Sequence, residues 1–170
     1  NGQFNSSNAK FGQLLYDINN AVRLGQSVSG YQGDRMVMSR GWGCSVSTRG
    51  VGPNTYVQIS TPMNSKTFGN PRSMSIAPIA VTGGSRGLFH TGGWPGHQWN
   101  SSFEYITIST PGNSNYFGNA SRRLVEGQGV SDGTRGVFSG GWNGWWCARN
   151  DIEYVTIATP SNYRHFGHTW

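Results

Sequence analysis

Two tryptophan-rich loops hold the residues of this chain that are best suited to binding another molecule. Both loops combine indole rings with Gly, Asn or Gln, and arginine stands close by. Trp and Arg concentrate at the energetically important positions of protein interfaces, and flat indole rings also stack well on sugars. The candidate ligand or interface residues are Trp94, His97, Trp99, Trp142, Trp145, Trp146 and Arg149.

Some of these tryptophans recur along the chain and others do not. A tryptophan that recurs at one position in every repeat is expected to pack between repeats, and Trp42, Trp94 and Trp142 follow that pattern. The remaining three occur once each, so both packing and ligand contact stay open for them. They are Trp99, Trp145 and Trp146.

Catalytic chemistry finds little support in the sequence. Only seven residues are acidic, and Glu104 and Glu153 stand at the same repeat position beside a tyrosine. A structural role is favoured for this pair, because the carboxylates of a glycosidase must converge within about 10 Å. The four histidines show no metal-ligand spacing: His90, His97, His165 and His168. We expect no catalytic residue, no metal and no cofactor.

The two cysteines, Cys44 and Cys147, form no CxxC motif and no Cys/His ligand set. They fall in equivalent loops of repeats that are two units apart. In a head-to-tail dimer, the third unit of one chain would border the first unit of the other. An interchain Cys44–Cys147 disulfide is therefore one hypothesis, and two free or buried thiols are the alternative.

A fixed period governs the whole chain. The segment at 103–118 returns at 152–167 and, less closely, at 54–69, and the equivalent tyrosines lie 49 residues apart. A period near 50 residues is typical of repeat architectures, in which each unit is one supersecondary block. We expect the end of a preceding or shared unit at 1–12 and full units at 13–69, 70–118 and 119–170.

The composition favours short strands joined by tight turns. Only 35% of residues are hydrophobic and 12% charged, while 26 are Gly, and 7 Trp, 7 Tyr and 8 Phe argue against disorder. Period-2 alternation and Gly-containing turns predict about four strands in each unit. The expected strands are 27–29, 36–38, 56–60, 75–81, 86–89, 103–109, 116–117, 129–131, 135–138, 152–158 and 165–166.

The positive charge also follows the repeat. The net charge is +6, and Arg35, Arg86 and Arg135 occupy matching positions. Repeated placement predicts that these residues brace one unit against the next, whereas nucleic-acid binding proteins usually show a basic patch. We therefore do not expect a nucleic-acid partner. No apolar run approaches the roughly 20 residues that cross a bilayer, and we expect no membrane partner.

The repeat resembles a known family. Unit three has the pattern RGxFxGG at Arg135–Gly141, and unit two has it at Arg86–Gly93 with one extra residue before the double glycine; both continue with EYxTIxTxxNxxxFG. A Gly-Gly strand end followed by a Tyr-bearing strand resembles the kelch repeat, and the full pattern is similar to the kelch-like repeats of bacteriophage and cyanophage structural proteins. The first unit departs from it, since Arg40-Gly41 replaces the double glycine. The resemblance implies a β-propeller and a virion component, such as a capsid decoration, whisker or tail-fibre protein.

We therefore expect an all-β, kelch-like β-propeller arc of about three four-stranded antiparallel blades, completed by another chain. A β-trefoil is the alternative fold. The expected function is that of a non-enzymatic virion structural protein at the particle surface or outside the cell, which assembles with itself and with other virion proteins. The alternative is a carbohydrate-binding lectin or receptor-binding module that recognises cell-surface glycans, and an enzyme ranks third.

Overall fold

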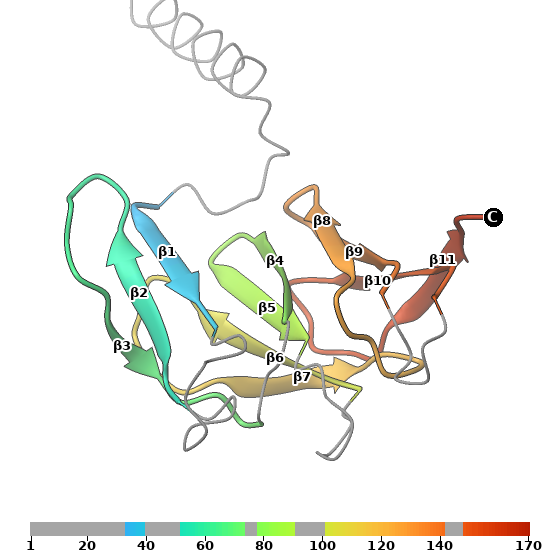
Figure 1. Cartoon of the computed structure of the whole chain (residues 1–170), viewed down its shortest axis with the longest axis horizontal. Helices are drawn as coiled ribbons and strands as arrows, with labels where there is room; N and C mark the ends of the chain where they lie inside the picture. Colours follow the sequence, from blue (N-terminus) through green and yellow to red (C-terminus); the bar gives the residue numbers. More distant parts are fainter. Residues whose placement is uncertain (1–32, 40–51, 74–77, 91–100, 142–147) are drawn as a thin grey trace, which may run out of the picture.

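The computed structural model describes residues 33–39, 52–73, 78–90, 101–141 and 148–170. All the regular elements in these ranges are β-strands, arranged as three antiparallel sheets. Figure 1 shows the sheets following one another in the colour order of the chain, from blue and teal through green and yellow to orange and red. The described residues contain no helix that could span a membrane. The all-β expectation is confirmed for this part of the protein.

Each sheet is a simple meander of strands that are neighbours in sequence. The first sheet contains β1 (Arg35–Met38), β2 (Asn54–Gln58) and β3 (Lys66–Gly69). The second contains β4 (Ile79–Gly83), β5 (Arg86–His90), β6 (Ser102–Thr107) and β7 (Asn115–Asn119). The third contains β8 (Gln128–Ser131), β9 (Arg135–Ser139), β10 (Asp151–Thr156) and β11 (Arg164–His168).

The predicted strands in the described ranges are confirmed, with shifted ends. β6 and β10 stop two residues earlier than expected, because turns follow at once: the N–H of Thr110 donates to the carbonyl oxygen of Thr107, and Thr159 does the same to Thr156. The described part of the 75–81 strand begins at Ile79, and β11 is longer than the two residues expected. The strand expected at 27–29 and the unit end at 1–12 lie outside the described residues.

Two hairpins show why the turn signals were informative. Gly84 and Gly133 adopt positive φ angles of 56° and 89° between β4–β5 and β8–β9, a conformation that glycine adopts at little cost. Asp132 adds a side-chain acceptor, because its Oδ1 receives the N–H groups of Thr134 and Arg135 at 2.8 and 2.6 Å. These hydrogen bonds fix the start of β9.

The three sheets pack face to face, and the apolar core lies in the two junctions between them. Strand β4 lies against β8 and β9, so the first strand of the second sheet packs on the first two strands of the third. A small cluster fills the junction between the first and second sheets: Phe68, Phe89, Ile106 and Ile108, with Val37 and Tyr56 packed against it. A larger cluster fills the next junction and includes Val81, Leu88, Phe103, Phe117, Phe138, Val155, Ile157 and Tyr163.

A bulge recurs at the same place in every sheet. The pairing register shifts between Asn54 and Thr55, between Phe103 and Glu104, and between Ile152 and Glu153. A bulge places two residues of one strand opposite one residue of its partner and re-aims the side chains that follow. In the third sheet it sets the direction of the side chains of β11.

Candidate functional site

Most of the candidate residues taken from the sequence lie outside the described residues. They are Cys44, Trp94, His97, Trp99, Trp142, Trp145, Trp146 and Cys147. Their proposed roles, including the interchain disulfide, stay predictions. Arg149 is described, and its side chain is buried rather than presented to a ligand. It forms an ion pair with Asp151, while its N–H donates to the carbonyl oxygen of Gly141 at 3.0 Å.

Both junctions between sheets contain an arginine at the same position of the repeat. Nη1 of Arg35 in β1 donates to the carbonyl oxygen of Ile108 in the second sheet at 2.9 Å. Nη1 of Arg86 in β5 reaches the third sheet in the same way and donates to the carbonyl oxygen of Ala158 at 2.6 Å. Each guanidinium also lies 4.6 Å from the ring of a tyrosine in its own sheet, Tyr56 or Tyr105. The expected bracing role is confirmed for both arginines.

An asparagine contact also repeats at the two junctions. The N–H of Asn70 donates to Oδ1 of Asn113 at 2.9 Å, and the N–H of Asn119 donates to Oδ1 of Asn162 at 3.0 Å. The carbonyl oxygens of Asn70 and Asn119 in turn accept N–H groups from the facing sheet, both at 2.9 Å. The edges of the first and second sheets thus each pair through their main chain with a turn of the next sheet.

Glycine makes this close approach feasible. A Cβ built on Gly69 would fall well inside contact distance of the carbonyl oxygen of Gly112, and one on Gly118 would do the same to Ser161. Only a residue without a Cβ lets the two backbones meet there. Gly167 is the equivalent residue of the third sheet, and a Cβ on it would meet nothing within 4 Å.

Two glutamates at the same position of the second and third repeats bind the chain where it passes from one sheet to the next. Glu104 accepts the N–H of Arg72 at 2.9 Å and the hydroxyl of Ser73 at 2.8 Å. Glu153 accepts the N–H of Ser121 at 3.2 Å in the same way. Both carboxylates are buried, so their hydrogen bonds fix the path of the chain from one sheet to the next.

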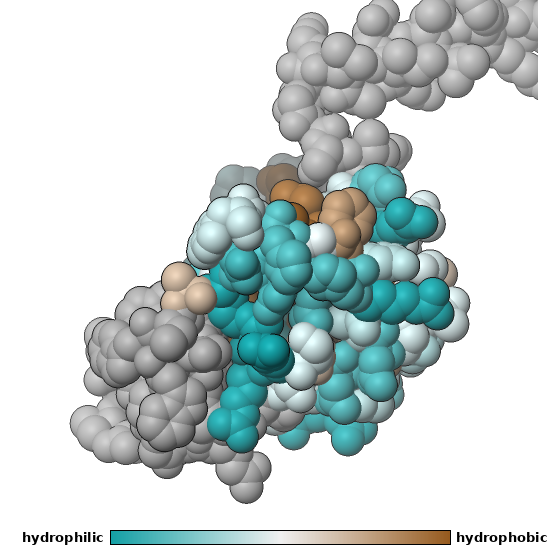
Figure 2. All heavy atoms as spheres, turned by 90° about the vertical axis from the view of Figure 1, so that its right-hand side faces the viewer, coloured by the Kyte–Doolittle hydropathy of each residue, from teal (hydrophilic) through white to brown (hydrophobic). Residues whose placement is uncertain are grey.

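The outer faces of the first and third sheets expose apolar residues whose equivalents in the other repeats are buried in the junctions. Ile59 is 67% exposed, whereas its equivalent Ile108 is 3% exposed. On the third sheet Val130 and Phe166 are 63% and 56% exposed, whereas their equivalents in the junctions are almost fully buried: Val81 at 5% and Phe117 at 1%. Viewed from the third-sheet side, the surface in Figure 2 carries a small apolar group among largely hydrophilic residues.

The third member of the arginine series lies on this same outer face. Arg135 lies 5.2 Å from the ring of Tyr154, so its guanidinium keeps the stacking geometry of Arg35 and Arg86. Among the described residues, no carbonyl oxygen receives its guanidinium as Ile108 and Ala158 receive those two. The third sheet therefore presents an arginine like those that donate at the junctions. The first sheet presents Ile59, the equivalent of the residue Ile108 whose carbonyl oxygen accepts from Arg35.

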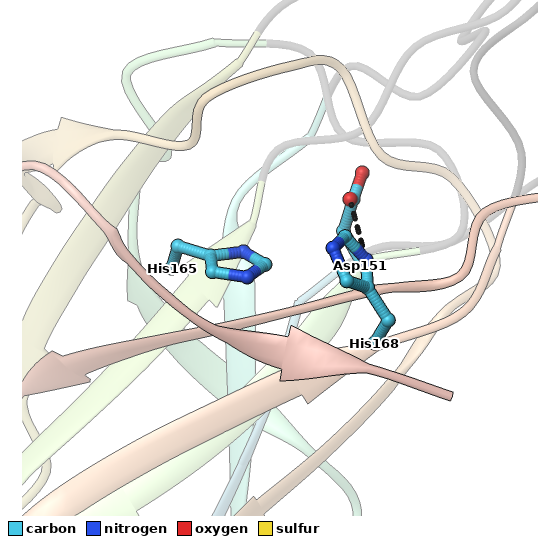
Figure 3. A group of neighbouring side chains, drawn as sticks. All are labelled: Asp151, His165 and His168. Carbon is cyan, nitrogen blue, oxygen red and sulfur yellow. Dashed lines mark ion pairs between the residues drawn. The ribbon is translucent and has the colours of Figure 1, made fainter. Parts of the chain in front are cut away.

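A cluster of metal-ligand residues appears at the edge of the third sheet. Asp151 begins β10, and His165 and His168 lie on β11 beside it. One possible ligand atom from each residue lies within 4.8 Å of the others, as Figure 3 illustrates. Nδ1 of His168 lies 3.4 Å from Oδ1 of Asp151. The sequence spacing predicts no metal site, because residues three apart in a regular strand point to opposite faces. The bulge opposite Ile152 and Glu153 brings His165 and His168 to the same face of the strand.

Several groups in and near the junctions have shifted pKa values. Burial lowers the pKa of His90 to about 4, and burial together with the charge of Glu153 raises the pKa of Tyr163 well above its usual 10.0. Burial acts to raise the pKa of Asp151, but the hydrogen bond and charge of Arg149, with Arg122 and His168, hold it below the usual value. Asp151 is therefore ionised at neutral pH.

Comparison with protein-family models and with curated proteins gives no match to this chain. The assignment of function thus depends on the repeated junctions and on the surfaces that they leave open.

Proposed function

We propose that this protein is a non-enzymatic assembly module, whose three sheets are successive blades of a β-propeller and whose outer faces pair head to tail with a second copy. One observation carries the proposal: residues that are buried at the internal junctions are exposed at the equivalent positions of the two outer faces. Ile59, Val130 and Phe166 are apolar although they are exposed, as a residue that awaits a neighbouring blade would be.

The two outer faces are complementary because both halves of the junction recur. The third sheet offers Arg135, Gly167 and the main chain of His168, in the places of Arg86, Gly118 and Asn119. The first sheet offers the carbonyl oxygen of Ile59 and the amide of Asn64, in the places of Ile108 and Asn113. Joining them repeats a contact that the chain already makes twice.

The sheet topology favours propeller blades over the trefoil alternative. All described strands pair within their own sheet, in sequence order, and the apolar contacts between the sheets come from their faces. Propellers are built from such four-stranded sheets and have about 4–8 of them. Three blades fall short of a ring, and two chains of three would form a six-bladed ring.

The biological setting follows from the resemblance of the repeats to those of phage structural proteins. A module that assembles through its own repeats suits a capsid decoration, whisker or tail-fibre component, with other virion proteins as further partners. Glycan binding through Trp145 and its neighbours is the second role that the sequence predicts.

The test uses the mass of the protein in solution and two single-face variants. Light scattering on the wild type should give twice the 18.5 kDa chain mass. Ile59→Asp and Val130→Asp should each give monomers, because each damages one half of every shared junction. Mixing the two variants should restore dimers, since one chain keeps an intact first sheet and the other an intact third sheet.

The mixing result separates head-to-tail pairing from other kinds of dimer. In an isologous dimer the same patch meets itself, so a mixture of the two variants would gain nothing. A wild-type protein that remains a monomer at about 100 micromolar, where a contact with a Kd of about 1 micromolar (about −8.2 kcal/mol) would hold most chains in dimers, would overturn the proposal. So would a dimer that both variants leave intact.

A further inference from the structure

The Asp151, His165 and His168 cluster has the geometry of an open metal site. Both imidazole rings project from β11 to the side on which Asp151 lies, as Figure 3 shows. The strand pairing explains this, because His168 pairs with Asp151 and His165 with Glu153, which are two residues apart on β10. The extra residue of the bulge, Phe166, is what lets two histidines three positions apart share one face.

These three residues break the repeat pattern at the same time. The second sheet carries Ser102, Tyr116 and Asn119 at the equivalent positions, and the first unit carries Pro53, Thr67 and Asn70. None of these six is a strong metal ligand. Three positions therefore carry a ligand-type side chain in this one unit and not in the other two, and the fold brings all three together.

We propose that Asp151, His165 and His168 bind a divalent transition-metal ion, with zinc as the best match. Imidazole and carboxylate form a mixed nitrogen and oxygen set that suits zinc, and sites with three protein ligands keep a further position for water or another molecule. His165 and His168 are exposed, so an ion reaches them from solvent without any opening of the fold. The three ligand atoms now lie within 4.8 Å of one another. If each moved by about 1 Å, they would reach the spacing found around a tetrahedral ion with bonds of 2.0–2.1 Å.

Arg149 defines how the carboxylate takes part. It is buried and pairs with Oδ2 of Asp151, so Oδ1 is the oxygen that remains directed toward His168. This arrangement orients the carboxylate in the way that outer partners orient metal ligands. The same guanidinium opposes a second cation, and it restricts the site to one ion bound through one carboxylate oxygen.

The ion would tie the start of β10 to the end of β11 in the third sheet alone. It would also leave an open coordination position at the surface of that sheet, for water or for a side chain of another molecule. This inference does not depend on the proposed assembly, because all three ligands belong to one chain.

The test is isothermal titration calorimetry of the untagged full chain with zinc chloride at pH 7.5. We expect one ion per chain with micromolar affinity, and a higher Tm in the presence of zinc that is reversed by a chelator. The variant His165→Tyr/His168→Asn restores the residues of the second sheet, so it should fold normally in the absence of metal. It should bind zinc at least tenfold more weakly and lose the rise in Tm.

A second variant keeps the inference distinct from binding elsewhere in the chain. Cys44→Ser/Cys147→Ser removes both thiols and should leave the affinity unchanged. Failure of the wild type to bind zinc would overturn the proposal. It would equally be overturned if the histidine variant bound as tightly as the wild type, or if the cysteine variant lost the ion.

Discussion

Ile59 and Ile108 occupy equivalent positions of neighbouring repeats, yet Ile59 is 67% exposed and Ile108 is 3% exposed. The side chains are identical, and each directly follows the last residue of its strand, Gln58 of β2 or Thr107 of β6. The difference comes from what lies opposite: the first sheet covers Ile108, and none of the three described sheets covers Ile59. Comparing this pair shows how much side-chain surface one junction buries.

Replacing each isoleucine by alanine should therefore have different effects. Ile108→Ala should lower the free energy of unfolding by about 2–5 kcal/mol, as buried large-to-small changes do. Ile59→Ala should change it by no more than about 0.5 kcal/mol in dilute protein, because the side chain is exposed there. Urea denaturation at low protein concentration measures both, and equal losses would contradict the assignment of Ile108 to a junction.

The arginine series provides a second matched pair. Arg86→Ala removes charged hydrogen bonds to the third sheet and should cost about 1–2 kcal/mol, since the guanidinium is only partly buried. Arg135→Ala should leave the stability of the dilute chain unchanged, but should weaken self-association measured by light scattering. An Arg86→Ala variant as stable as the wild type would show that the bracing bonds contribute nothing.

The edge glycines provide a third pair. Gly118→Ala places a methyl group against the carbonyl oxygen of Ser161 and must push the second and third sheets apart, which should cost about 1–3 kcal/mol or more. Gly167→Ala meets no described atom, so the isolated chain should tolerate it. Thermal unfolding of the two variants checks this contrast. Two variants with the same Tm would refute it.

Acid should weaken the fold through His90. Its pKa is about 4 in the folded protein and about 6.5 in the unfolded chain, so only the unfolded chain gains a proton in this interval. The stabilisation is complete above pH 6.5 and is lost as the pH falls toward 4, by about 2 kcal/mol between pH 7 and pH 5. Urea denaturation across this range measures the slope, and His90→Phe should reduce it. A slope unchanged in that variant would assign the effect to other groups.

Strand positions were predictable from this sequence because the repeats reinforce weak local signals. Alternation at Tyr105–Thr107 and the Asp132-Gly133 turn would each be ambiguous alone, but their return after 49 residues removed the ambiguity. The bracing role of Arg35 and Arg86 was predictable for the same reason.

The cluster of Asp151, His165 and His168 could not be predicted by spacing. It depends on a bulge whose extra residue is Phe166, whereas a strand of regular alternation would place His165 and His168 on opposite faces. The useful signal was present in another form, because these positions depart from the repeat. Departure from the repeat is a sequence signal of its own, although only the fold shows that the three departing residues meet.

The contact of Gly69 and Gly118 with the facing turns involves main-chain atoms on both sides. A contact between main-chain atoms depends little on the neighbouring side chains, so the residues beside it can differ from repeat to repeat while the sheets still stack. Thr67, Tyr116 and His165 illustrate that freedom at a single position. A scaffold joined in this way can acquire new chemistry on one edge at little risk to its architecture.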